Sequence, residues 1–184
     1  AKQIYESENE GKRVLVIDTL STGPEIALAI EKVEELVEAG MPYEEICKSI
    51  TQYIKRTGLL FMLKSLKSLA NNGRVSPIAA KLVGIVGIGV VGKASNEGTL
   101  EQMHKCRGER RALETILTDL EAEGFRSGKI SIGHCRNESA ALQLKELILS
   151  KFKNAMIEIH KLRGLCSFYA ENGGVLVGFE KAPV

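Results

Sequence analysis

The chain has 184 residues, of which 44% are hydrophobic and 26% charged, and its formal net charge at pH 7 is +2. This composition predicts a globular protein with a full hydrophobic core, and so small a charge gives no reason to expect nucleic acid or membrane insertion. No apolar run is long enough to span a membrane, and the scattered cysteines favour a reducing, cytoplasmic setting with neither disulfide nor metal site: Cys47, Cys106, Cys135 and Cys166.

The first predicted elements are a short helix, a buried strand and two longer helices. The apolar run Arg13–Ile17 is typical of a buried strand. The loop after it leads into a helix over Pro24–Ala39, for which Thr22 is a candidate N-cap. A second helix is expected over Pro42–Arg56. Inward-facing side chains are expected at Ile26, Ala27, Ile30, Val33, Leu36, Val37, Ile46, Ile50, Tyr53 and Ile54.

The central stretch, Leu59–Leu82, combines a strand, a short helix and a tight corner. Leu59–Leu63 has the apolar character of a buried strand, and leucines then continue at helical spacing. Asn71-Asn72-Gly73 favours a helix end, because Asn and Gly accept the left-handed conformation found there.

A second short helix is predicted after this corner. Ser76 is a natural N-cap, and Pro77 suits the first helical position. Arg74 is thereby placed on short, stiff backbone between two helices. Its cation can meet an anion or a partner carboxylate there, or it can be a solvated loop charge.

The second half of the chain predicts an α+β fold with α/β-type layers, in which helices cover a mixed, largely antiparallel sheet. Helices are expected over Arg107–Gly124 and Glu138–Phe152. The last two strands are predicted to form a hairpin. Strands are expected over Ile88–Ala94, Thr99–Lys105, Lys129–Cys135, Met156–His160, Leu165–Tyr169 and Val175–Phe179.

The glycine-rich segment Gly87–Gly92 matches G-x-G-x-x-G, but its context argues against a nucleotide site. These glycines lie inside a strand-like run rather than between a strand and a helix, and Ala94 stands where a phosphate-binding loop needs Ser or Thr. No convincing catalytic constellation is found. An α/β small-molecule or nucleotide-dependent enzyme domain remains the alternative function, and an assembly domain that pairs through a sheet edge is a third.

Several segments, in order along nearly the whole chain, resemble the carboxyl-terminal part of the DegV family of bacterial fatty-acid-binding proteins. Val16-Ile-Asp-Thr-Leu-Ser21 is similar to the family's strand ending in Ile-Asp-Ser/Thr, and Asn72-Gly-Arg-Val-Ser76 to its Gly-Gly-Arg-Ile-Ser corner. Lys105-Cys-Arg-Gly-Glu-Arg-Arg-Ala112 resembles its Arg-Gly-x-x-Lys-Ala helix start. Gly133-His-Cys-Arg-Asn-Glu138 resembles its His-Ala-Asp-Asn-Glu segment.

The resemblance implies a binding protein rather than an enzyme. A long-chain fatty acid would lie between two domains as ligand, without a cofactor, and would be presented to a fatty-acid kinase. Residues 1–22 would be a remnant of the amino-terminal domain and residues 23–184 the carboxyl-terminal domain. The chain would then be a fragment that lacks the main carboxylate-binding half.

The resemblance also implies ligand-binding residues. Arg74 and Arg107 match family arginines near the head group or the partner surface, and Tyr169 stands where the family often has a head-group histidine. Ser21 and Thr22 are pocket candidates at a strand's carboxyl end, with helix capping as their alternative role.

Overall fold

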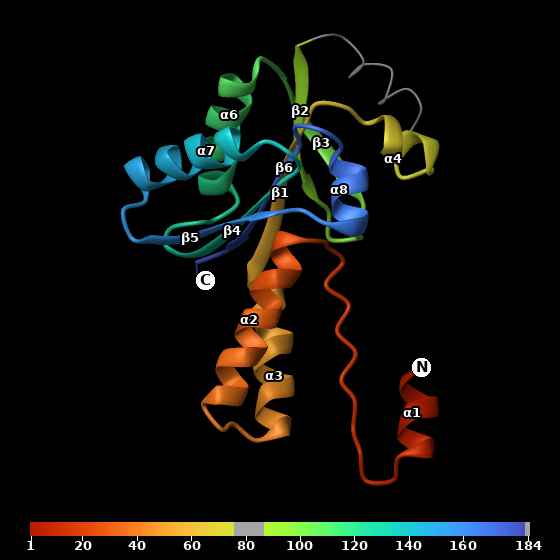
Figure 1. Cartoon of the computed structure of the whole chain (residues 1–184). Coiled ribbons are helices and arrows are strands. Elements are labelled where there is room, and N and C mark those ends of the chain that lie inside the picture. Colours follow the sequence, from red (N-terminus) through yellow and green to blue (C-terminus); the bar gives the residue numbers. More distant parts are fainter. Residues whose placement is uncertain (76–86, 183–184) are drawn as a thin grey trace.

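The computed structural model describes residues 1–75 and 87–182, and its central element is a six-stranded mixed sheet (Figure 1). The strand order is β3-β2-β1-β6-β4-β5, and β4–β5 is the parallel pair among otherwise antiparallel neighbours. This arrangement confirms the predicted fold class. The strands are β1 (Thr57–Leu63), β2 (Ile88–Ala94), β3 (Leu100–Arg107), β4 (Gly128–His134), β5 (Ala155–Lys161) and β6 (Val175–Glu180).

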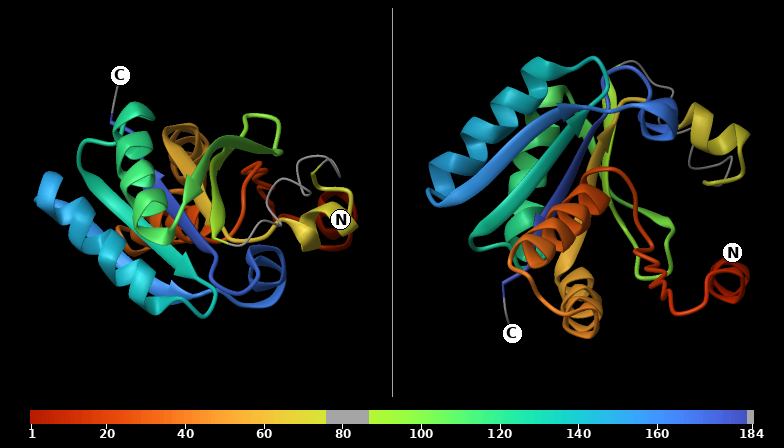
Figure 2. Two further views of the ribbon diagram at one scale, coloured as in Figure 1. Left: turned by 90° about the horizontal axis from the view of Figure 1, so that it is seen from above. Right: turned by 60° about the horizontal axis from the view of Figure 1, so that its bottom comes forward.

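Helices lie on both faces of the sheet, with α6 and α7 on one side and α2, α4 and α8 on the other (Figure 2). A short 3₁₀ turn, Ile54–Arg56, follows α3. The α-helices in the described residues are α1 (Lys2–Glu8), α2 (Pro24–Glu38), α3 (Tyr43–Tyr53), α4 (Lys67–Asn71), α6 (Glu109–Ala122), α7 (Glu138–Lys151) and α8 (Gly164–Ala170).

The two faces of β1 serve two different layers, because successive side chains of a strand point to opposite sides. Leu60 and Met62 join the main core beneath α6 and α7, where large side chains are almost fully buried. Leu59, Phe61 and Leu63 belong to a second cluster on the opposite face. The apolar run predicted as a buried strand is therefore buried on both sides.

Helix α2 approaches the sheet very closely at its first turn. A Cβ atom added to Gly178 of β6 would lie 2.6 Å from the backbone nitrogen of Glu25 and 2.6 Å from the carbonyl carbon of Pro24. Further along, α2 and α3 run away from the sheet as a helical pair (Figure 1). The predicted inward face of α2 is consequently wrong at Ile30 and Val37, which are 54% and 58% exposed.

Two predicted strands are absent from the described structure. Residues 13–17 are extended but pair with no strand, and Val16 is 66% exposed. A strand needs a hydrogen-bonded neighbour as well as an apolar pattern, and the described residues supply none here. Leu165–Tyr169 is part of helix α8, so the predicted final hairpin is also wrong.

The predicted helix end at Gly73 is confirmed in detail. The N–H of Arg74 donates to the Leu69 carbonyl over 2.8 Å, and the N–H of Gly73 donates to the Ala70 carbonyl over 3.1 Å. Gly73 has φ +67°, and this geometry is a Schellman motif. The helix predicted to start at Ser76 and Pro77 lies outside the described residues.

Candidate ligand-binding site

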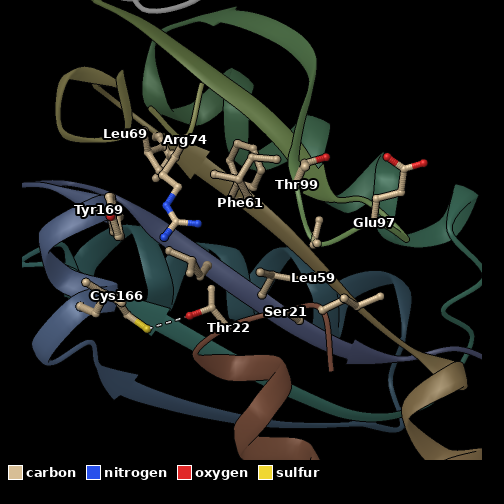
Figure 3. A pocket seen from close by; sticks show the side chains of 18 of the residues that line it. Ser21, Thr22, Leu59, Phe61, Leu69, Arg74, Glu97, Thr99, Cys166 and Tyr169 are labelled. Atoms are coloured by element: carbon tan, nitrogen blue, oxygen red, sulfur yellow. Dashed lines mark hydrogen bonds between the residues drawn. The ribbon is translucent and has the colours of Figure 1, made fainter. Parts of the chain in front are cut away.

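A cavity of about 550 Å³ lies on the face of the sheet opposite α6 and α7 (Figure 3). Its floor consists of apolar side chains from adjacent strands: Leu59, Phe61 and Leu63 of β1, and Leu176 of β6. Its walls are short segments that lie far apart in the sequence: residues 18–22, Leu69 of α4, the β2–β3 turn, and α8. An apolar floor under polar walls suits a ligand that is mostly hydrocarbon with a polar end.

Arg74 supplies a positive charge to this cavity. The Schellman motif holds its backbone directly after α4, and its guanidinium points into the cavity toward Tyr169 and Thr22 (Figure 3). No carboxylate in the described part of the chain forms an ion pair with it. A guanidinium in this position can donate two parallel hydrogen bonds to a carboxylate.

Ser21 and Thr22 also line the cavity, and both hydroxyls already have partners. The Ser21 hydroxyl donates to the carboxylate of Glu25, which is only 7% exposed and also accepts a hydrogen bond of 2.6 Å from Thr57 Oγ1. Thr22 Oγ1 lies 3.1 Å from Cys166 Sγ of α8. Thr22 is therefore the hydroxyl that can turn a proton toward a ligand, whereas the Ser21 proton is committed to Glu25.

The structure corrects the capping role considered for Thr22. The residue before α2 is Gly23, with φ +52°, and no side chain caps this helix end. A Cβ at position 23 would lie 3.3 Å from Cys166 Sγ. The positive φ and the close approach of Cys166 both favour glycine at position 23.

Tyr169 lies on α8 at the cavity wall, close to a connection that fixes two walls together. The backbone N–H of Ser68 in α4 donates to Glu171 Oε1 over 2.7 Å. Glu171 therefore satisfies an N–H at the start of α4 from the end of α8, although about a hundred residues separate the two in sequence. Its backbone has φ +52° and ψ −177°, a conformation strongly preferred by glycine.

Four of the five predicted site residues line this cavity, and the fifth does not. Arg107 ends β3 as an exposed side chain outside the cavity lining. Sequence reasoning missed Phe61 and Cys166, which line the cavity, and Glu25, which orients Ser21. Because alternate side chains of a strand point to opposite faces, Phe61 could be placed on the same face as Leu59 and Leu63. The run Leu59–Leu63 is apolar throughout, however, so the sequence does not tell which of the two faces borders a cavity.

Two titratable clusters lie elsewhere. Burial raises the pKa of Asp119, and His104, whose Nε2 is 3.1 Å from Asp119 Oδ1, partly opposes that rise. Asp119 Oδ2 is buried and has no hydrogen-bond partner among the residues that the structure describes. Burial also lowers the pKa of His160, against the nearby charge of Glu158.

Residues 1–75 and 87–182 contain no cluster of three His, Cys, Asp or Glu side chains arranged for a metal ion. No helix within these residues has both the length and the apolar character needed to cross a bilayer. The glycines at 89 and 92 lie inside strand β2 and open no helix, as the sequence context predicted.

The chain combines an α+β fold with a cavity on one face of its sheet, and comparison places it in a family. A family model described as "Uncharacterised protein, DegV family" matches residues 1–182, and the chain belongs to this family. A DegV domain-containing protein of Streptococcus pyogenes serotype M1 is 40% identical over 180 residues, which are 98% of this chain and 64% of the relative. The chain thus spans slightly under two thirds of the curated relatives it matches.

Solved structures of similar proteins contain fatty acids. The Streptococcus pneumoniae Fatty Acid Kinase (Fak) B3 protein, loaded with linoleic acid, is 40% identical with a TM-score of 0.96, over 98% of this chain and 64% of that one. A DegV family protein from Eubacterium eligens, loaded with heptadecanoic acid, is 38% identical with a TM-score of 0.95, over 98% and 65% of the two chains.

Proposed function

We propose that this chain binds a long-chain fatty acid, with the acyl chain in the cavity and the carboxylate near Arg74. The observation that carries the proposal is the cavity itself, in which a guanidinium and hydroxyls stand over an apolar floor. Each buried CH₂ contributes about 0.8 kcal/mol, so a floor of large apolar side chains favours a long tail. The fatty acids in similar structures support this assignment.

About a third of the relatives' length lies outside the part that matches this chain. This affects where we place the binding site of the ligand carboxylate. We propose that the chain corresponds to the carboxyl-terminal part of DegV proteins, with a domain boundary after residue 22, and that the acyl group lies between this cavity and another domain. In that arrangement Arg74, Thr22 and Tyr169 contribute to the carboxylate site without completing it. Residues 1–22 then belong to the neighbouring domain, in keeping with their exposure here, since none of them is buried.

The protein is further proposed to carry the acid to a cytoplasmic fatty-acid kinase and to perform no chemistry itself. The name of the pneumococcal relative supports a kinase as partner. Arg107 is the proposed contact for acidic residues of that partner, because it is exposed outside the cavity. Reversing its charge should then weaken phosphorylation of the acid by the kinase and leave fatty-acid affinity unchanged.

The test of binding compares an acid with an uncharged analogue in the longest natural protein that contains this chain. Arg74→Gln should weaken binding of palmitic acid by about ten-fold, near the lower value for a hydrogen bond to a charged group. It should leave binding of hexadecanol nearly unchanged. Arg110→Gln is the matched control, because Arg110 is exposed on α6 and pairs with Glu114.

Isothermal titration calorimetry and native mass spectrometry read out both ligands. No bound palmitate on the unaltered protein would refute the function. Equal losses of acid and alcohol binding in Arg74→Gln would refute the role of Arg74.

A further inference from the structure

Phe61 occupies the centre of the cavity floor. It is 3% exposed and lies on β1 between two neighbouring strands, opposite Gly92 of β2 and Leu176 of β6. In Figure 3 its ring lies beside the Arg74 side chain, between Leu69 and Thr99. Any chain that crosses the floor must therefore pass this ring.

The ring leans over β2 and uses space that a side chain at position 92 would take. A Cβ atom added to Gly92 would lie 2.5 Å from Phe61 Cζ and 3.0 Å from Cε2. Gly92 has no positive φ, so its backbone conformation does not require glycine. Two neighbours do: the backbone carbonyl oxygen of Glu101, which would be the nearest atom to the added Cβ, and the Phe61 ring.

A small residue also lines the cavity on β2. Ala94 lies two residues after Gly92 and belongs to the cavity lining. Next to Gly92, which has no side chain, the Phe61 ring takes the space above the strand. The distance by which the Phe61 ring projects from the sheet into the cavity sets the cross-section of the cavity that is left for a ligand.

We infer that Phe61, seated over Gly92, sets the cross-section of the acyl slot and selects extended acyl chains over bent ones. This inference rests on the proposed binding of fatty acids. A cis double bond bends a chain, so an acid such as oleic acid needs a wider slot than stearic acid of equal length. Removing the ring therefore favours the bent chain, by about four-fold for each methylene that gains contact.

The experiment measures dissociation constants for stearic and oleic acid by calorimetry, using the longest natural protein that contains this chain. Phe61→Ala and the milder Phe61→Leu should each shift relative affinity toward oleic acid by at least about four-fold. Ala94→Val, which enlarges a side chain of the cavity lining, should shift it the other way. Gly92→Ala is unsuitable, because its Cβ would also collide with the Glu101 carbonyl and disturb β2–β3 pairing.

Leu60→Ala is the matched control. Leu60 is the neighbouring residue on β1 and is 0% exposed, but it faces the main core instead of the cavity. Its truncation weakens packing without widening the slot, so the ratio of the two affinities should not change. Folding of each variant is checked by circular dichroism, and Phe61→Leu decides the question should Phe61→Ala fail to fold.

The outcomes separate the two proposals. If the unaltered protein binds neither acid, the proposed function falls. If it binds them, but the Phe61 variants give the same ratio as Leu60→Ala or a shift toward stearic acid, the inference about Phe61 is overturned and fatty-acid binding stands.

Discussion

Replacing Gly178 by alanine should destabilise the protein by pushing helix α2 off the sheet. The added Cβ would lie 2.6–2.7 Å from three backbone atoms of Pro24 and Glu25, and a backbone cannot rotate out of the way as a side chain can. Overpacking of this kind typically costs about 1–3 kcal/mol. Replacing a strand glycine by alanine otherwise gains about 0.5–1 kcal/mol, so we expect a net loss of about 1–2 kcal/mol.

Gly89→Ala provides the control for this variant. Gly89 also lies in a strand with no positive φ. Within residues 1–75 and 87–182 its added Cβ would meet only the Leu63 carbonyl oxygen, at an ordinary 3.5 Å. This variant should match the wild-type free energy of unfolding or exceed it by up to about 1 kcal/mol. The two single-methyl substitutions should therefore differ by about 2 kcal/mol.

Urea denaturation followed by far-ultraviolet circular dichroism measures this difference. The slopes of the transitions should agree, because neither change alters the surface exposed on unfolding. Gly178→Ala should also weaken fatty-acid binding, since α2 begins directly after Ser21 and Thr22. Equal stability of the two variants would refute the close-approach argument.

Three further predictions concern Glu171, Asp119 and His160. Glu171→Ala should speed amide exchange at Ser68 about five-fold, because it removes the acceptor of the Ser68 N–H. Glu171→Gly should have a free energy of unfolding about 1 kcal/mol higher than that of Glu171→Ala, because φ at this position is +52°. Unchanged exchange at Ser68 in Glu171→Ala would contradict the hydrogen bond to Glu171. Burial raises the pKa of Asp119, so the folded protein binds that proton more tightly than the unfolded chain does. The free energy of unfolding should therefore fall as pH rises above about 4, and Asp119→Asn should lack this part of the pH dependence. If the free energies of unfolding of the wild type and of Asp119→Asn change in parallel between about pH 4 and 7, this explanation is wrong. Burial lowers the pKa of His160, so the free energy of unfolding should fall as pH drops below about 6.5. His160→Gln should lose less stability over the same pH range. Equal loss of stability in acid for the wild type and His160→Gln would exclude this explanation.

Much of the fold follows from local patterns. Strand β2 is found at its predicted bounds, β4 is shifted from its own by one residue, and helix α7 ends one residue early. Alternation and helical spacing are properties of the segment itself. Residues 13–17 are different. Their apolar run predicts burial, but only the fold supplies the hydrogen-bonded partner that makes a strand. Leu165–Tyr169 fails for another reason, since a mostly apolar segment of five residues fits helix and strand equally well.

The candidate site depends on contacts between distant segments, which periodicity cannot predict. The family resemblance selected Arg74 and Tyr169, and a position at the end of a predicted strand selected Ser21 and Thr22. The fold brings all four to one cavity. Their roles in binding stay predictions, as does that of Arg107. Phe61 was visible as part of a buried strand, but its importance depends on a glycine opposite it on the neighbouring strand.

The contrast between the two faces of the sheet has a thermodynamic consequence. The face under α6 and α7 is filled by the protein's own side chains. The other face forms the floor of a cavity whose walls are short segments. Individual hydrogen bonds, such as that from Ser68 to Glu171, connect these segments. Local opening is cheapest where few apolar contacts must break. A ligand that binds only the closed walls adds RT ln(1 + [L]/Kd) to the free energy of opening them. Proteases and amide exchange should therefore distinguish the ligand-free protein from the ligand-bound one at α4 and α8, while the central strands exchange alike in both.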